Sequence, residues 1–489
     1  MHIDMRRAIW AIVLLLAGAS LAGAAADARL TEAARHQDMA TVRALLAEGA
    51  PVNETGGDGF APLHWAVQWN HAEIADLLIA AGADANTATR YGVTPLTLAC
   101  INASAGMVER LLQAGADPLG AQTNGETALM TCARTGAPAA VQALLDRGAD
   151  VNATEAARGQ TALMWAAWEG HTDVVRSLLA HGAGVDARTT TGYTALLLTS
   201  REGYRETTEV LLAAGADVNG AAADGTTALV IAIIRRHLEY AEFLLDQGAD
   251  PNLGPGFTPL HWAAGKWDTE LNDLSNGVVE GNQWSAFGGL RDPDRLRAVR
   301  LLIAHGADLD VKTNRTPGFG IQVKGHLGNM KGATPFLIAA KANDVDVMRE
   351  LIAHGADPLI ATDNGTTPLM VAAGVGHAPG ITRSAEGEAL RAVTLCVELG
   401  ADVNAVNEAG DTALHGAAWR ERADSIVQFL IERGAEMDAR NHREWTPLVI
   451  AEGIHTGGNY IKSDTTAALL RQLGAAPSPP DILREPEAR

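Results

Sequence analysis

The sequence predicts an all-α array of short stacked repeats. A Gly-Ala-Asp step recurs every 33 residues, or after a single 67-residue double interval, at Gly82, Gly115, Gly148, Gly215 and Gly248. A Thr-Pro-Leu or Thr-Ala-Leu triplet lies between successive steps, and the segments between these two markers carry apolar residues at helical spacing. A fixed period of this length indicates a solenoid rather than a domain with one closed core.

The triplet marks the start of the first helix in each repeat. The hydroxyl of Thr161 can accept a hydrogen bond from the first helical turn, and the proline of Thr94-Pro95-Leu96 is tolerated at the first helical position. An apolar, alanine-rich run follows at residues 162–167. Small side chains allow neighbouring helices to approach closely, so we expect a short, closely packed helix here.

A second helix completes the repeat. After the turn at Gly170, apolar residues follow at helical spacing from Val174 to Leu179, and Gly182 then suits a left-handed C-terminal cap. The Asp and Asn that follow most Gly-Ala steps favour a turn toward the next triplet. The predicted unit is therefore helix, turn, helix and extended turn.

This unit resembles the ankyrin repeat, whose Thr-Pro-Leu-His, Gly-His and Gly-Ala-Asp-Val-Asn elements it matches closely. Eleven helix-start markers, from Ala61 to Thr446, repeat the pattern after a degenerate opening unit at residues 29–51. The resemblance implies an ankyrin-repeat solenoid of about 12 helix-turn-helix units over residues 27–475, of the exported bacterial type. It also implies that the histidines of the motif, such as His64, His261 and His415, tie backbone groups together rather than bind metal.

The two ends of the chain differ from the array. Basic Arg6 and Arg7 precede an apolar stretch and an Ala-x-Ala site, so residues 1–26 predict a cleaved secretory signal peptide and a periplasmic or secreted protein. The alternative for this segment is an uncleaved membrane anchor. At the other end, the Pro-rich residues 476–489 are expected to be disordered.

Three insertions interrupt the period in the C-terminal half, near residues 266–291, 316–332 and 374–386. We expect loops there, the first and third between two helices of a unit and the second as a lengthened hairpin. Loops of a solenoid are candidates for function, but these loops could equally pack on their own repeats and recognise nothing.

The three cysteines are expected to fill core positions. Cys100 and Cys132 occupy the Ala-Ala slots of neighbouring first helices, and Cys396 occupies a leucine slot. A bridge between Cys100 and Cys132 is conceivable in an oxidising compartment, but packed helices lie about 8–10 Å apart, so we expect the two Cα atoms to be beyond disulfide reach.

The charge limits the classes of partner. The formal net charge is −20, which opposes binding to a phosphate backbone, so we expect no nucleic-acid partner. No segment beyond the N-terminus is long and apolar enough for a membrane span. We expect a monomer without a stable span after signal cleavage.

Aromatic residues make up only 4% of the chain, so their positions are informative. In ankyrin repeats, the residue before the Thr-Pro-Leu triplet and the residues after the Ala-Ala pair face the partner-binding groove. Large rings at such positions resemble interface anchors, although each could instead cover the neighbouring repeat. The candidates at these positions are Phe60, Trp69, Trp168, Tyr193, Phe257, Trp419 and Trp445. The first insertion adds Trp267, Trp284 and Phe287. In contrast, we expect Trp65, Trp165 and Trp262 to serve packing.

No catalytic motif accompanies the repeats. The sequence lacks Gly-x-Ser-x-Gly, His-Glu-x-x-His, Cys-x-x-Cys and phosphate-loop patterns. We therefore expect no enzyme activity, cofactor or metal. The predicted function is a protein-binding scaffold or adaptor with a protein partner. The alternatives are a secreted effector acting on a host protein and, further from the sequence, an enzyme with a site built by the inserted loops.

Overall fold

The computed structural model describes residues 29–266, 292–314, 331–376, 385–420, 422–456 and 459–478. The predicted signal peptide, most of each predicted insertion and the tail from residue 479 lie outside these residues. The chain divides into two compact units, Met1–Asp217 and Val218–Arg489. Within the described residues, each unit contains six helix pairs. The predicted all-α repeat array of about twelve units is confirmed.

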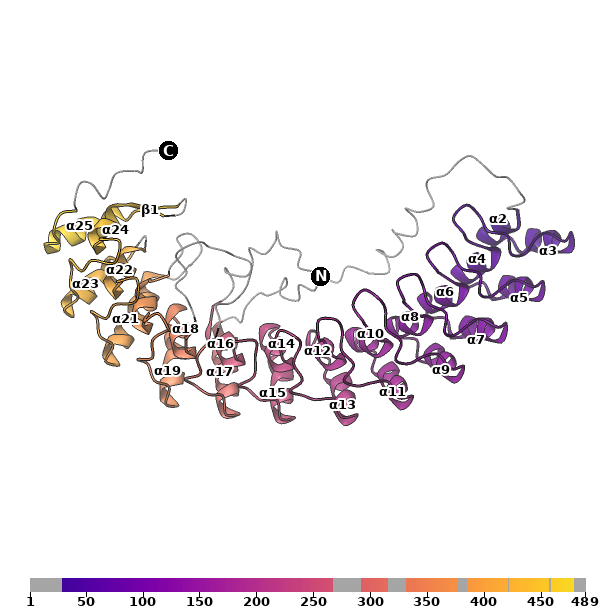
Figure 1. Cartoon of the computed structure of the whole chain (residues 1–489), viewed down its shortest axis with the longest axis horizontal. Helices are drawn as coiled ribbons and strands as arrows, with labels where there is room; N and C mark the ends of the chain where they lie inside the picture. The colour runs from indigo at the N-terminus through magenta and orange to yellow at the C-terminus, as the bar shows by residue number, and fades with distance from the viewer. Residues whose placement is uncertain are drawn as a thin grey trace. The chain divides into compact units, whose positions relative to one another are not determined.

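The first unit has two layers of helices (Figure 1). One layer holds the first helix of each pair: α2 (Arg29–Arg35), α4 (Pro62–Gln68), α6 (Pro95–Ile101), α8 (Ala128–Thr135), α10 (Ala162–Glu169) and α12 (Ala195–Ser200). The other holds the second helices: α3 (Met39–Ala47), α5 (Ala72–Ala80), α7 (Ala105–Gln113), α9 (Pro138–Asp146), α11 (Thr172–Ala180) and α13 (Arg205–Ala213). Each first helix packs on the first helix of the next pair. The core is therefore continuous along this unit.

The second unit repeats this arrangement. Its first helices are α14 (Ala228–Ile234), α16 (Pro259–Ala264), α18 (Pro335–Lys341), α20 (Pro368–Ala373), α22 (Ala413–Ala418) and α24 (Pro447–Glu452). Its second helices are α15 (Leu238–Asp246), α17 (Asp292–Ala304), α19 (Val345–Ala353), α21 (Glu386–Glu398), α23 (Asp424–Glu432) and α25 (Asp464–Leu473). A short antiparallel hairpin, β1 (Ile454–Thr456) and β2 (Asn459–Ile461), joins α24 to α25. This hairpin was not predicted from the sequence.

Threonine caps begin most first helices, as predicted. The hydroxyl of Thr161 accepts a hydrogen bond from the backbone N–H of Met164 at 3.3 Å. The same bond forms at Thr94, Thr127, Thr194, Thr227, Thr334, Thr367, Thr412 and Thr446. Each bond satisfies one of the N–H groups that a helix N-terminus leaves without an internal partner. The recurrence of this cap explains why one triplet can start nearly every repeat.

The histidine of the motif joins successive repeats, as the resemblance implied. His261 is fully buried; its Nδ1 accepts from the backbone N–H of Thr258 at 3.0 Å, and its Nε2 donates toward the carbonyl oxygens of Val311 and Ala333 at 3.0 and 3.2 Å. A neutral ring with its proton on Nε2 satisfies all these bonds. His64 and His415 reach the carbonyl oxygens of Val93 and Trp445 in the same way. Burial lowers the pKa of all three histidines.

An asparagine clamp is a second link between repeats. Asn86 donates from Nδ2 to the carbonyl of Gly115 at 2.9 Å and accepts at Oδ1 from the N–H of Asp117 at 2.7 Å. One side chain therefore binds both polar groups of the next turn. The same pair of bonds forms at Asn53, Asn152, Asn219, Asn252 and Asn404. From the sequence, these asparagines were assigned only to turns, and the link between repeats was missed.

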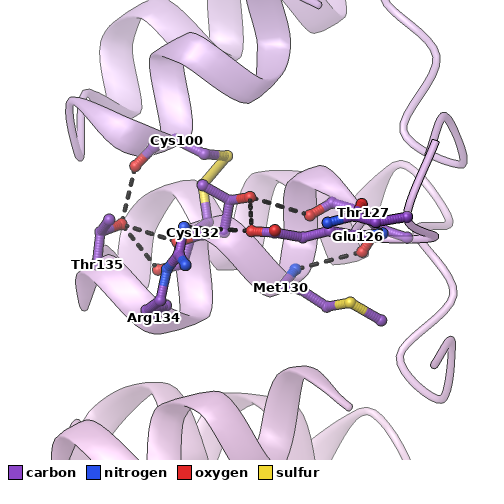
Figure 2. Close-up of polar contacts among 9 residues, drawn as sticks. Cys100, Glu126, Thr127, Met130, Cys132, Arg134 and Thr135 are labelled. Atoms are coloured by element: carbon purple, nitrogen blue, oxygen red, sulfur yellow. Dashed lines mark hydrogen bonds and ion pairs between the residues drawn. A yellow bond between two sulfur atoms is a disulfide. The ribbon is translucent and has the colours of Figure 1, made fainter. Parts of the chain in front are cut away.

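Cys100 and Cys132 form a disulfide that joins α6 to α8 (Figure 2). Our expectation that these residues lie too far apart was wrong, because their Cα atoms are 4.5 Å apart. A spacing of about 8–10 Å separates helix axes, whereas Cα atoms on the facing sides are closer by roughly twice the helix radius of 2.3 Å. Small residues at these positions permit that approach. Cys396 is buried as expected, and burial raises the pKa of its thiol to about 12.

Candidate protein-binding surface

Within each compact unit, the first helices present a face that we call the first-helix face. It comprises the residue before the cap and the fourth and seventh residues after it. The ring of Phe60, before a cap, lies 5.0 Å from that of Trp65, at a fourth position. Arg35, at a seventh position, lies over the same Trp65 ring at 5.1 Å from one repeat earlier. These contacts show that the three positions of neighbouring repeats form one surface.

Four predicted candidates have rings that reach solvent. Trp69 is 40% exposed, and its Nε1 donates to the carbonyl of Arg35 at 2.9 Å. Phe60, Trp168 and Trp445 are half-buried. Arg443 lies over the Trp445 ring at 4.9 Å from the centroid. These four rings remain available, in part, for contact with a partner.

The expectation of a solvent-facing ring is wrong for three candidates. Tyr193, Phe257 and Trp419 are only 7%, 2% and 8% exposed. The Phe257 ring folds back on its own helix, 5.5 Å from Trp262. Trp419 lies edge-on against the ring of Trp445 in the next repeat, at 6.4 Å. These three rings stabilise the repeats instead of presenting a binding surface.

The remaining predicted aromatic residues fall into two groups: those assigned to packing and those in the first insertion. Trp65 and Trp262 are 8% and 4% exposed, which confirms their assignment to packing. Trp165 is half-buried. The candidates of the first insertion, Trp267, Trp284 and Phe287, lie outside the described residues.

Two arginines and two tryptophans form a stack on the first-helix face, which we call the Arg–Trp stack. Arg134 of α8 lies over the Trp165 ring at 5.1 Å, and Trp165 stacks on Trp168 of the same helix at 6.3 Å. Arg201, directly after α12, lies over the Trp168 ring at 4.8 Å. Arg134, Trp168 and Arg201 all occupy the seventh position of successive repeats. The aromatic ring in this position was predicted from the sequence, but the arginines on either side of it were not.

The extended turns before the caps form a row of fingers. Four of them in the first unit, which we call the four fingers, are residues 87–93, 120–126, 153–160 and 187–193, each closed by a backbone hydrogen bond across its base. Successive tips are joined by backbone bonds from Thr123 to Tyr91 at 3.3 Å, from Ala156 to Asn124 at 2.9 Å and from Thr190 to Arg158 at 2.8 Å. Gly92 permits this contact, because a Cβ there would lie 2.8 Å from the Cα of Gln122. The fingers are therefore held side by side.

Arginines are exposed on these fingers, whereas two carboxylates turn inward. Arg90, Arg158 and Arg188 are exposed. Glu155 is 8% exposed and accepts from the N–H groups of residues 157, 158 and 160 at 2.6, 2.7 and 3.1 Å. Glu126 pairs with Arg134 at 3.2 Å and accepts from the Thr131 hydroxyl at 2.9 Å (Figure 2). Both carboxylates thus form their hydrogen bonds and ion pair within their own repeat.

The described residues contain neither a metal-binding cluster nor a helix suited to span a membrane. No cluster of three or more His, Cys, Asp or Glu side chains among them is arranged to hold a metal ion. The part of the chain that the structure describes also contains no helix of the length and apolarity that a membrane crossing requires.

Proteins with known names match parts of this chain. Neurogenic locus notch homolog protein 1 of Danio rerio is 32% identical over 217 residues, which are 40% of this chain and 8% of that protein. Alpha-latroinsectotoxin-Lt1a of Latrodectus tredecimguttatus is 29% identical over 159 residues, 32% of this chain and 9% of the toxin. The E3 ubiquitin-protein ligase KEG of Arabidopsis thaliana is 30% identical over 146 residues, 29% of this chain and 8% of the ligase. The chain spans less than a tenth of the length of these relatives, so the likeness concerns one part of each.

Family models cover most of the chain. A model described as "Ankyrin repeats (3 copies)" matches residues 14–89, 30–121, 81–155, 117–191, 153–222, 220–271 and 294–382. A second, "Ankyrin repeats (many copies)", matches residues 381–426. Together with the helix pairs, the caps and the histidine links, these matches show that the chain belongs to the ankyrin repeat family.

Proposed function

We propose that this protein is a binding scaffold that captures a partner protein on its first-helix face and fingers. The observation that carries the proposal is a pair of partly exposed rings: Trp168 on this face, which lies against the guanidinium of Arg201, and Trp69, one position beyond the face, whose Nε1 donates to the backbone carbonyl of Arg35. Tryptophan and arginine are the residue types that contribute most to the free energy of protein association.

Rigidity supports this function. The caps, the histidine links and the asparagine clamps fix the first helices and fingers before any partner arrives. Little conformational entropy is then lost on binding, so a larger part of the contact free energy appears as affinity.

We also propose that the mature protein acts in the periplasm or outside the cell. Residues 1–26 carry the basic, apolar and small-residue regions of a secretory signal. The bond between Cys100 and Cys132 supports the same location, because disulfides persist in oxidising compartments. N-terminal sequencing of the protein from an envelope or extracellular fraction tests this, and a chain that begins at Met1 in such a fraction would contradict it.

The second candidate is a secreted effector that acts on a host protein. The observation that favours it is the similarity to a protein named as a toxin, alpha-latroinsectotoxin-Lt1a. Recovery of the protein inside host cells, instead of in the periplasm, would favour the effector over the resident scaffold.

Photo-crosslinking tests the scaffold. A photoreactive phenylalanine analogue at position 168 should crosslink one partner protein in an extract of the compartment where the chain resides. The same analogue at Leu119, which is 58% exposed but lies in the turn after a second helix, is the matched control. We expect a band that is specific to position 168 and is lost in a Trp69→Ala variant. Identical bands from positions 168 and 119, or none from position 168, would contradict the scaffold function.

A further inference from the structure

We propose that the four fingers and the Arg–Trp stack recognise a short acidic segment of the partner, bound in an extended conformation. This inference rests on the proposed scaffold function and adds the chemistry of what is bound. It concerns residues 87–201, which lie within the first unit.

The charges of these repeats are divided between two sides. The fingers and first helices carry the arginines at positions 90, 134, 158, 188 and 201. Of the carboxylates beside them, Glu126 is paired with Arg134, Glu155 accepts from backbone N–H groups of its own finger, Glu169 is half-buried, and Glu202, next to Arg201, is exposed. The second helices and their turns carry the opposite excess, with Asp117, Asp146, Asp150, Asp173 and Asp186 all exposed. The positive charge of this face is therefore concentrated in Arg90, Arg158 and Arg188 on the fingers, on a chain whose net charge is −20.

Arg90, Arg134 and Arg201 lie beside aromatic rings that an acidic segment could also contact. Arg90 lies over the ring of Tyr91 at 5.5 Å, and Tyr91 is 52% exposed. Arg201 lies over Trp168 at 4.8 Å. A guanidinium that stacks on a ring by its face directs its N–H groups outward in its own plane, in the geometry that suits a carboxylate. The surface thus offers guanidinium groups that can donate hydrogen bonds to carboxylates, together with aromatic rings for apolar contact.

Spacing favours a peptide in extended form. Packed helices lie about 8–10 Å apart, and an extended chain advances about 3.3 Å per residue, so one finger corresponds to roughly three residues. Carboxylates about three residues apart would meet Arg158 and Arg188 on successive fingers. The three separations of the Arg–Trp stack, 5.1, 6.3 and 4.8 Å, correspond to roughly five residues at most.

A nucleic acid would also carry negative charge, but the rest of the chain opposes it. A phosphate polymer extends beyond these repeats into the field of a molecule with a net charge of −20, whereas a short peptide segment need not. The observations therefore favour the peptide, and the oligonucleotide becomes a control.

Fluorescence anisotropy with the full chain tests the inference. The probe is a fluorescein-labelled peptide of about twelve residues, built from Glu-Gly-Tyr units, which is long enough to cover four fingers. The matched probe has Gln in place of Glu, and a third probe is a single-stranded oligonucleotide of similar length. We expect the Glu peptide to bind at low salt at least tenfold more tightly than either control, and the Kd to rise at least tenfold between 50 and 300 mM NaCl.

Arginine variants locate the site. The triple variant Arg90→Gln, Arg158→Gln and Arg188→Gln should weaken binding of the Glu peptide at least tenfold. The matched control removes the same charge from second helices, through Arg43→Gln, Arg110→Gln and Arg176→Gln, and should change the Kd less than threefold. Circular dichroism verifies that both variants stay helical. A Trp168→Leu variant, which keeps an apolar side chain in place, should weaken binding while leaving the salt dependence unchanged.

The outcomes separate this inference from the scaffold function. Equal binding of the Glu and Gln peptides, tighter binding of the oligonucleotide, or equal effects of the two triple variants would overturn the inference. If photo-crosslinking at position 168 still captures a partner in any of these cases, the scaffold function stands and only the acidic segment is rejected. Peptide binding with no crosslinked partner would reject the scaffold function instead.

Discussion

His261 is the residue whose burial gives the fold a dependence on pH. Burial lowers the pKa of this histidine to about 4, whereas an unfolded histidine has a pKa near 6.5. Between these values only the unfolded chain binds the proton, so stability is complete above about pH 6.5 and falls as the pH drops toward 4, by on the order of 3 kcal/mol. His261→Gln should reduce stability at pH 7 and flatten this dependence. Urea unfolding at pH 7 and pH 4.5 measures both effects, and an unchanged pH dependence in this variant would contradict the prediction.

Each asparagine clamp makes two hydrogen bonds with one side chain, so its loss should be measurable. Asn152 binds the carbonyl of Gly182 and the N–H of Gly184 at 3.1 and 2.8 Å. Asn152→Ala should lower the free energy of unfolding by about 1–3 kcal/mol.

Leu119 offers the reverse substitution, because it occupies the clamp position of its repeat and is 58% exposed. Leu119→Asn should restore the link to the turn at Gly148 and raise the unfolding free energy by about 0.5–1.5 kcal/mol. A loss of stability in this variant would show that the clamp asparagines serve only their own turns.

The role of a residue could be predicted where it depends only on residues close to it in the sequence. Threonine caps act within three residues, so the triplet alone was enough to place them. The ring of Phe257 folds onto Trp262 at the fourth position after the cap and is buried, whereas Phe60 makes the same contact with Trp65 and stays half-buried. A rule based on one position in the repeat cannot include that contact, and it therefore assigned Phe257 to the surface.

At the scale of helices, the disulfide between α6 and α8 should be a large local contribution to stability. It joins residues 32 apart in the sequence, and restricting an unfolded loop of that size is worth about 3–4 kcal/mol in the chain-entropy model. A Cys100→Ala and Cys132→Ala double variant should unfold at lower urea concentration than the oxidised chain and should no longer respond to reductant. If reductant leaves the wild-type midpoint unchanged, the bond does not stabilise these repeats.

A buried ion pair joins α17 to α19. Arg295 is 2% exposed and its Nη2 donates to Asp344 at 2.6 Å, while Asp344 also caps α19 through the N–H of Val347. Asp344→Asn keeps a good cap but removes the negative charge beside a buried guanidinium, so it should lower the free energy of unfolding by about 3–5 kcal/mol. The matched variant is Asp38→Asn, which changes an exposed cap at α3 and should leave thermal unfolding almost unaltered. Similar losses from both would show that the negative charge at a helix N-terminus, and not the ion pair, matters.

Helix boundaries were predicted well where the repeat keeps its period and less well where it does not. Helix α17 begins at Asp292, directly after the predicted first insertion. The hairpin of β1 and β2 was missed, although its two strands flank a Gly-Gly pair, which is a hairpin signal. A strand pattern was predicted only in the insertion at residues 316–332, most of which lies outside the described residues.

For the whole molecule, the fold could be predicted because the same local solution recurs in every repeat. The charged face of the fingers follows no period: Arg90, Arg158 and Arg188 stand two, one and four residues before the glycines of their fingers. Comparing the repeats position by position identifies the residues that they share. It does not identify a residue that occurs in one repeat only. Recognition depends on the unique residues, so the family could be predicted further than the binding surface.

A stacked array of repeats also predicts which helices lose stability when one buried residue is replaced. Leu144 of α9 is fully buried, and Leu144→Ala should cost about 2–5 kcal/mol. Because each repeat contacts only its neighbours, the loss should appear first in the amides of α8–α11, which should exchange hydrogen faster. The helices α18–α25, in the other compact unit, should keep their wild-type protection. Leu359→Ala, at a residue that is 50% exposed, is the control and should change neither region. Hydrogen exchange with mass spectrometry resolves these segments, and an equal loss of protection along the whole chain would mean that the repeats share one cooperative core instead of a chain of interfaces.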